Sequence, residues 1–271
     1  LQNSFRYEML SVAPHVSDVL FSNFDKSLVK DRTFHLGSAI LTLLKDWNHW
    51  AFSTSAMYTQ RAPGIEDLFS DGPHLGSYSY EIGQPDLDLE STLGFEISTK
   101  YVKNKFSSSV TAFNNYSPNY HLFSKIGNGY VPGADWIEWG SGSTGWLYKY
   151  QMKGIEANIS GLEFDLSYKV NNTTFSVDYS TVIGDDINAS MPLPYMPAAK
   201  GRGKLSYSGQ NNLSYTFQVV KGFDQKRLGQ FENQTDGYIC VDLYGSYSIN
   251  SLKGSHKIVF QIDNIFDQIY Y

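Results

Sequence analysis

A strict alternation of apolar and polar side chains recurs along this sequence and limits the folds that it can adopt. In residues 162–168, apolar side chains occupy every second position, and Glu163 and Asp165 lie between them. Residues 213–220 and 238–249 alternate in the same way. A period of two places neighbouring side chains on opposite faces of a β-strand. Each segment therefore predicts a strand with one apolar face and one polar face.

Eleven strands are expected from this pattern, and the connections between them alternate in length. The expected bounds are residues 2–12, 32–45, 49–61, 88–102, 106–117, 147–169, 173–183, 200–208, 213–225, 237–249 and 256–266. Long loops such as 62–87 alternate with short turns such as 103–105, so all the long loops lie at one end of the sheet. Soluble β-sandwiches follow no such rule, whereas outer-membrane barrels combine short periplasmic turns with long external loops. The sequence therefore predicts an all-β, antiparallel transmembrane β-barrel.

The odd number of strands implies that residues 1–271 form only a fragment of a barrel. A closed bacterial barrel made of one chain has an even number of strands and no free edge. We therefore expect at least one closing strand to be absent. Aromatic residues gather near the ends of the expected strands, as they do in interfacial girdles. These residues are Tyr7, Trp47, Trp50, Tyr58, Tyr101, Tyr116, Tyr168, Tyr179 and Tyr207.

Composition and motifs argue against several other classes of protein. The net charge is -6 and no run rich in Lys or Arg occurs, so no nucleic-acid partner is expected. A single cysteine, Cys240, excludes an internal disulfide framework and a cysteine metal cage. The longest nearly apolar run, 36–44, is far shorter than the roughly 20 residues of a membrane-spanning helix. No hydrolase, NTPase or dinucleotide motif is present, so we expect no enzyme and no catalytic residues.

Residues 60–90 interrupt the alternation with prolines, glycines and carboxylates. Proline removes a backbone donor and restricts the residue before it, and glycine disfavours regular structure. The segment therefore predicts a long loop without a strand, with one short helical turn at 64–69. Long loops of this kind are usually functional.

The same segment resembles the signature loop of TonB-dependent outer-membrane receptors. The matching residues are Arg61-Ala62-Pro63, 65–69, Gly72-Pro73-His74, 81–87 and Glu90, and further similar elements follow at 161–163, 236–238 and 263–270. The resemblance implies a barrel of about 22 strands that is closed by an N-terminal plug domain. Residues 1–271 would then be a partial barrel domain, about its last half without the final strand and without the plug.

The resemblance also implies a function for the whole protein. Such a receptor lies in the lipid of the outer membrane of a Gram-negative bacterium. It binds a scarce nutrient, such as a ferric siderophore, haem or a metal such as zinc, through external loops. The TonB complex supplies the energy for import through the plug, and the only metal or chelate is the transported ligand, with no resident cofactor. Two alternatives remain: a passive diffusion barrel, and a soluble carbohydrate-binding β domain.

Two sets of external residues are candidates for ligand binding. His74 with Asp71, Glu66 and Asp67 forms a nitrogen and oxygen set that suits a divalent metal, and His15 and His121 lie in long loops on the same side. The alternative is that Asp71 caps its own backbone in a turn. The second set is aromatic and would stack on a catecholate, a porphyrin or a sugar, or pack on itself to hold the loop. It consists of Tyr130, Trp136, Trp139 and Trp146.

Overall fold

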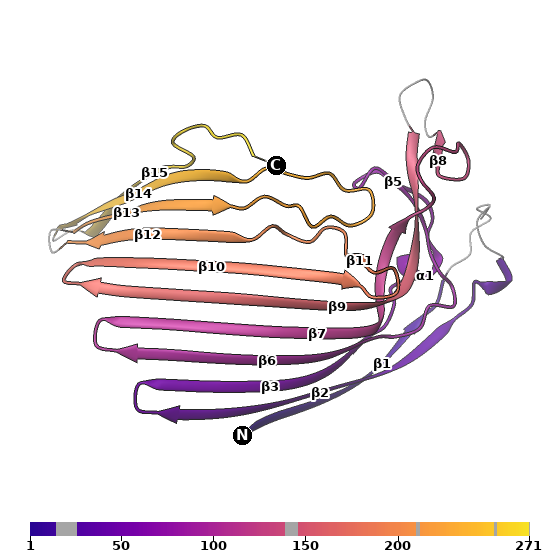
Figure 1. The fold of residues 1–271 in the computed structure, drawn as a ribbon, viewed down its shortest axis with the longest axis horizontal. Helices are drawn as coiled ribbons and strands as arrows, with labels where there is room; N and C mark the ends of the chain where they lie inside the picture. Colours follow the sequence, from indigo (N-terminus) through magenta and orange to yellow (C-terminus); the bar gives the residue numbers. More distant parts are fainter. Residues whose placement is uncertain (15–25, 139–145, 210–211, 252–253, 271) are drawn as a thin grey trace.

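The computed structural model describes residues 1–14, 26–138, 146–209, 212–251 and 254–270. Its main feature is one antiparallel sheet in which the long strands follow each other in chain order (Figure 1). The eleven long strands of the described residues are β1 (Gln2–Val12), β2 (Arg32–Trp47), β3 (Trp50–Arg61), β6 (Glu90–Lys103), β7 (Phe106–Lys125), β9 (Trp146–Val170), β10 (Thr173–Asp186), β12 (Lys200–Ser208), β13 (Leu213–Gly222), β14 (Tyr238–Ser251) and β15 (Gly254–Ile262). The prediction of an all-β antiparallel barrel fragment is confirmed.

Short elements occupy the long connections. They are η1 (Lys26–Leu28), α1 (Ile65–Phe69), β4 (Asp71–His74), β5 (Ser79–Ile82), β8 (Trp136–Glu138) and β11 (Met191–Pro192). The expected helical turn is therefore α1. The expectation of no strand between 60 and 90 is wrong, because β4 and β5 form a hairpin there. No helix in the described part of the chain is long and apolar enough to span a bilayer.

The register pairs apolar residues with apolar residues and polar residues with polar residues on neighbouring strands, so one apolar face and one polar face continue across the sheet. Phe164 pairs with Val110 on one side and Tyr179 on the other, so these three share the apolar face. Asp165 pairs with Ser109, whose hydroxyl donates to it at 3.2 Å, on the opposite polar face. The two faces are those that the alternation predicts.

Aromatic side chains line the apolar face at the end where the short turns lie. Trp50 pairs with Tyr101, and their ring centroids are 4.6 Å apart. Further along the sheet, Tyr207 pairs with Tyr215 with centroids 5.0 Å apart. Rings that pair across strands at one height form a band of the kind found at a membrane interface.

Some strand ends differ from the expected bounds for local reasons. β7 continues to Lys125 across an irregularity between Ser117 and Tyr120, where Pro118 suggested that the strand would stop. β15 ends at Ile262, because Asn264 adopts a left-handed backbone conformation with φ of 50°. The backbone N–H of Asn264 donates to the carboxylate of Asp242 in β14, and this contact turns the chain back over β14.

Candidate ligand-binding site

The signature loop is fastened to the polar face of the sheet by an apolar cluster. Leu68 of α1 and Leu87 pack there with Phe34 and Leu36 of β2. The register pairs Leu36 with Glu8, which places the apolar contact on the polar face of the strands. The apolar residues at this end of the polar face therefore hold the loop over the inner side of the wall.

Two hydrogen-bonded contacts complete the path of the loop. The Arg32 guanidinium donates to the carbonyl oxygens of Pro85 and Leu87 at 2.8 and 2.7 Å. The backbone N–H of Gly83 donates to the Ser70 carbonyl at 2.7 Å, which draws the end of β5 against α1. These contacts explain why a segment rich in proline and glycine has a defined shape.

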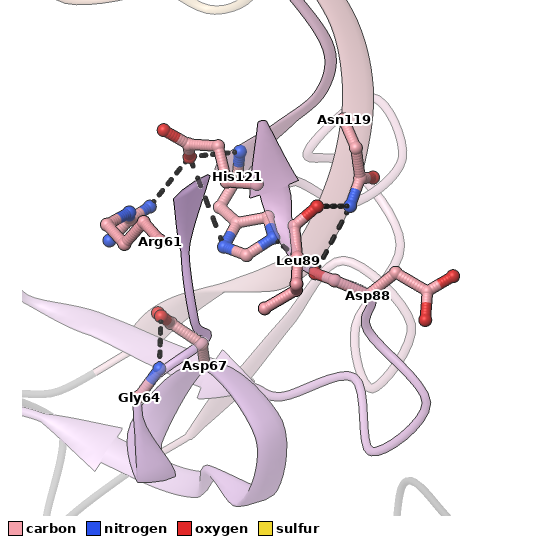
Figure 2. Close-up of polar contacts among 8 residues, drawn as sticks. Arg61, Gly64, Asp67, Asp88, Leu89, Asn119 and His121 are labelled. Carbon is pink, nitrogen blue, oxygen red and sulfur yellow. Dashed lines mark hydrogen bonds and ion pairs between the residues drawn. The ribbon is translucent and has the colours of Figure 1, made fainter. Parts of the chain in front are cut away.

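A charged cluster ties the loop to β3 and β7 (Figure 2). Arg61 donates to Glu90 at 2.8 Å, and the same carboxylate oxygen accepts the backbone N–H of His121 at 2.9 Å. The Asn119 amide donates to the carbonyl oxygens of Asp88 and Leu89 at 3.2 and 3.0 Å. The cluster thus joins the end of the signature loop to strands on both sides of it.

His121 belongs to this anchor and lies in β7, so its prediction as a loop residue is wrong. Its side chain is fully buried, and its Nε2 lies 2.8 Å from the Asp88 carbonyl oxygen. Because a carbonyl only accepts, Nε2 carries the proton and Nδ1 faces the Glu90 carboxylate at 4.0 Å. Burial lowers the pKa of His121 below its ordinary value, so the imidazole is neutral here.

At the end of the wall where β9 begins, β4, β5, the start of β9 and β8 form a small projecting sheet, which we call the upper sheet; β5 and β8 are seen at the right in Figure 1. β4 pairs with β5, β5 pairs in parallel with the start of β9, and β8 pairs with the other side of β9. In this register His74 lies opposite Ser79, Ser79 opposite Tyr148, and Tyr148 opposite Trp136. The row brings together residues from three separate parts of the sequence.

The two faces of the upper sheet have different roles. Tyr80, Ile82 and Leu147 are buried on one face, where they form a second apolar cluster. Since neighbouring residues of a strand point to opposite faces, His74, Tyr148 and their row lie on the other face. The exposed fraction of the His74 side chain is 60%. On this face the His74 side chain is largely exposed and Tyr148 and Trp136 are partly exposed, while Ser79 between them is buried.

His74 is held in one orientation by its neighbours in the turn of the β4–β5 hairpin and on β5. Its Nδ1 lies 2.9 Å from a Glu81 carboxylate oxygen and 2.9 Å from the Ser77 hydroxyl. Ser79 also donates to Glu81, at 2.9 Å. Since the carboxylate can only accept, Nδ1 carries a proton, and in the neutral form of the ring Nε2 then holds the lone pair. None of the described side chains forms a hydrogen bond with Nε2, so that atom is available to a ligand.

Aromatic rings and one cation continue this face beyond His74. The rings of Trp146 and Tyr148 meet edge to face at 4.6 Å, and Trp136 lies 6.2 Å from Trp146. The Lys125 ammonium lies 3.3 Å from the centroid of Tyr148 and 4.4 Å from that of Phe231. The contact between the rings of Trp136 and Trp146 agrees with the packing alternative for the aromatic set. Trp146 is also 55% exposed, and its stacking on a ligand stays a prediction.

The remaining predicted residues lie apart from this face. Asp71 accepts a hydrogen bond from Tyr80 at 3.0 Å, and Asp67 accepts the backbone N–H of Gly64 at 2.9 Å at the start of α1. Glu66 is exposed in the same helical turn, and Tyr130 extends from a separate turn with 82% of its surface exposed. His15 and Trp139 lie outside the described residues.

The structure does not assemble the predicted metal set. Within the described ranges, no three His, Cys, Asp or Glu side chains are grouped so that they could hold a metal ion. His74 and His121 belong to different clusters, and the carboxylates near them are engaged in the loop. A bare divalent ion normally requires three or four ligands.

Sequence reasoning missed Glu81, Tyr148 and Lys125. The Ser79–Ile82 segment alternates polar and apolar side chains, which is a strand signal that the surrounding prolines and glycines obscured. Tyr148 was expected only as a residue of the strand 147–169, and Lys125 fell in the connection between the expected strands 106–117 and 147–169. Their place beside His74 follows from the parallel pairing of β5 with β9, which no local pattern indicates.

Comparison with known proteins places this arrangement in a family. Residues 5–265 match the family model described as TonB dependent receptor-like, beta-barrel. A curated relative, Heme/hemopexin utilization protein C of Haemophilus influenzae, is 24% identical over 97% of this chain and 39% of its own length. The chain thus spans well under half of that relative.

Solved structures share the fold at low sequence identity. The copper transporter OprC superposes with a TM-score of 0.77 at 18% identity, covering 99% of this chain and 39% of that one. The FrpB iron transporter of Neisseria meningitidis gives a TM-score of 0.67 at 16% identity, with the same coverage. The ferric enterobactin receptor PfeA of Pseudomonas aeruginosa gives 0.63 at 20% identity, covering 89% and 36%. The chain therefore belongs to the TonB-dependent receptors, a family of outer-membrane proteins of Gram-negative bacteria, and matches their β-barrel.

Proposed function

We propose that the whole protein is an energised outer-membrane receptor that takes up haem or a similarly flat metal chelate. The observation that carries this proposal is His74, whose Nδ1 is fixed by Glu81 while Nε2 is left available on the aromatic face of the upper sheet. A histidine oriented through its other nitrogen by a carboxylate is the arrangement that favours metal ligation.

The dimensions and chemistry of the face suit a planar ligand. His74 and Tyr148 are separated by two strand spacings, which corresponds to about 10 Å. An iron porphyrin has open axial positions and needs only one protein ligand to bind, and its ring presents a large apolar face to Tyr148, Trp136 and Trp146. Lys125 lies at the same margin and can neutralise a carboxylate of the ligand.

The remaining parts of the proposal concern the whole receptor. Import requires a plug inside the barrel and energy from the TonB complex, and residues 1–271 supply part of the barrel wall and the ligand surface. The copper and iron transporters that share the fold support uptake of a metal-containing cargo in general. The haem-related curated relative supports haem over the others as the first cargo to test.

The test uses the full-length receptor with and without His74. Haem is added to the purified protein in detergent, and the Soret band and affinity are recorded. We expect His74→Ala to abolish the spectrum of histidine-ligated iron, and Glu81→Gln to weaken binding by roughly 10-fold to 100-fold, as loss of an outer-shell partner does. The same variants should fail to support growth on haem as the only iron source.

His35→Ala is the matched control, because this exposed histidine contacts Tyr7 on β1, away from the upper sheet. It should retain the spectrum and the growth of the unmodified receptor. Unchanged ligation and uptake in His74→Ala would contradict the proposal. Haem-dependent conductance without the TonB complex would support the passive-barrel alternative instead.

A further inference from the structure

At the opposite end of the wall, the apolar face contains a pocket that the proposed uptake does not use. Its volume is about 510 Å³, and it lies at the short turn between β6 and β7. The lining residues are Tyr101, Lys103, Asn104, Lys105, Phe106 and Tyr168. The pocket therefore combines an aromatic floor with two cationic side chains.

The register places the floor of this pocket on the face that would meet lipid. Phe106 pairs with Tyr168 on one side and with Lys103 on the other. Tyr101 lies two residues before Lys103 in β6 and so shares its face. The rings of Tyr101 and Phe106 are 5.9 Å apart and tilted. Asn104 has a φ of 53°, which forms the tight turn and sets a lysine on either side of it. The lysines thus stand at the edge of the aromatic band.

The end of the wall with the short turns is positively charged, whereas the net charge of the whole chain is negative. The sequence carries a net charge of -6, yet the first three short turns and their flanks hold Lys45, Lys103, Lys105 and Lys169 against one acid, Asp46. Among the described ion pairs, none includes Lys103 or Lys105. Their ammonium groups are consequently available to an external anion.

We propose that this pocket binds the phosphate headgroup of an anionic glycerophospholipid in the inner leaflet of the outer membrane. The Lys103 and Lys105 ammonium groups would meet the phosphate, while the glycerol and upper acyl chain lie on Phe106 and Tyr168. Lysines that reach from an aromatic belt into the headgroup layer are the usual means of such recognition. The inference rests on the proposed function in one respect, because that function places the short turns on the periplasmic side.

Native mass spectrometry of the full-length receptor in detergent tests this inference. The protein is titrated with phosphatidylglycerol, with phosphatidylcholine as the zwitterionic reference. Each interfacial lysine is worth about 1 kcal/mol, so Lys103→Gln with Lys105→Gln should weaken phosphatidylglycerol binding by about 30-fold. Binding of phosphatidylcholine should be unaffected.

Lys45→Gln with Lys257→Gln removes the same charge from the wall outside the pocket and should leave binding intact. An equal loss in both double variants would overturn the inference, since it would indicate a diffuse charge effect. Displacement of the lipid by soluble glycerol phosphate at equal concentration would also overturn it, because the aromatic floor would then contribute nothing. Heat-modifiable migration on gels verifies that each variant is folded.

Haem uptake measured in the same strains separates this inference from the proposed function. A receptor that imports haem but shows no preference for phosphatidylglycerol overturns the lipid site alone. A receptor that binds phosphatidylglycerol through Lys103 and Lys105 but imports no haem supports the lipid site and contradicts the proposed cargo.

Discussion

Gly83 shows how closely the signature loop approaches itself. A Cβ built on Gly83 would lie 2.5 Å from the carbonyl carbon of Leu68 and 2.6 Å from the backbone nitrogen of Phe69. Both neighbours belong to α1 and are backbone atoms, which cannot move aside as the end of a flexible side chain can. Gly72 lies in the same loop and has no atom within 4 Å of the corresponding position.

Gly83→Ala is therefore expected to destabilise the receptor by roughly 1–3 kcal/mol, the usual cost of forcing an extra methyl group into a packed site. Thermal unfolding of the full-length protein in detergent measures the change. Gly72→Ala is the matched control and should remain within about 0.5 kcal/mol of the parent. Equal stability of the two variants would show that α1 and the end of β5 separate readily.

At the scale of elements, the signature loop is attached by His121, Glu90 and Arg61. Because burial lowers the pKa of His121 in the folded protein, the unfolded side chain, with a pKa of about 6.5, takes up its proton at higher pH. The stability contributed by the neutral buried imidazole is fully present above that value. It is lost as the pH falls below about 6.5 towards the lower folded-state pKa.

We expect amide hydrogen exchange in residues 62–89, measured relative to the intrinsic rate, which itself slows as the pH falls, to accelerate between pH 7.5 and pH 5. Exchange in the middle of β9 should not change in this way. His121→Gln keeps a donor for the Asp88 carbonyl but does not titrate, so the acceleration should disappear in that variant. Acceleration that persists in His121→Gln would assign the effect to the neighbouring carboxylates Glu90 and Asp67.

Sequence patterns located the long strands well but failed where pairing depends on distant segments. The alternation of apolar and polar side chains in 162–168 indicates directly a strand with one apolar and one polar face. For this reason β9 and its neighbouring strands could be predicted. Pro73 concealed β4, although β4 pairs only with β5 and an edge strand tolerates proline. Pro118 likewise concealed the extension of β7 that contains His121. His74 could be singled out because its motif is local, and its role as a ligand stays a prediction, whereas its contact with Glu81 depends on the β4–β5 hairpin.

At the scale of the whole molecule, the wall has one face for lipid and one for the interior. The family consists of outer-membrane proteins, and the apolar face of this chain carries Val110, Phe164 and Tyr179 side by side. The polar face carries Asp165 beside Asp178, which in turn accepts from Arg202 at 2.9 Å. Because adjacent residues of one strand lie on opposite faces, their substitutions should change the free energy of unfolding by very different amounts.

Phe164→Arg should destabilise the folded barrel by roughly 2–4 kcal/mol, the cost of a lipid-facing arginine near the middle of the bilayer. The neighbouring change Asp165→Asn faces the interior and should cost much less. Unfolding of the full-length receptor in liposomes by denaturant measures both. A neutral Phe164→Arg together with a damaging Asp165→Asn would mean that the two faces are assigned the wrong way round.

The parallel pairing of β5 with β9 also determines when the ligand surface forms during folding. Each neighbouring pair in the wall closes across a connection of its own, but β5 and β9 can meet only after β6 and β7 have been placed between them in the chain. Contacts that depend on such distant closures form late. The His74 row is therefore expected to form only after β6, β7 and β9 have paired, later than the hairpins of the wall that it rests on.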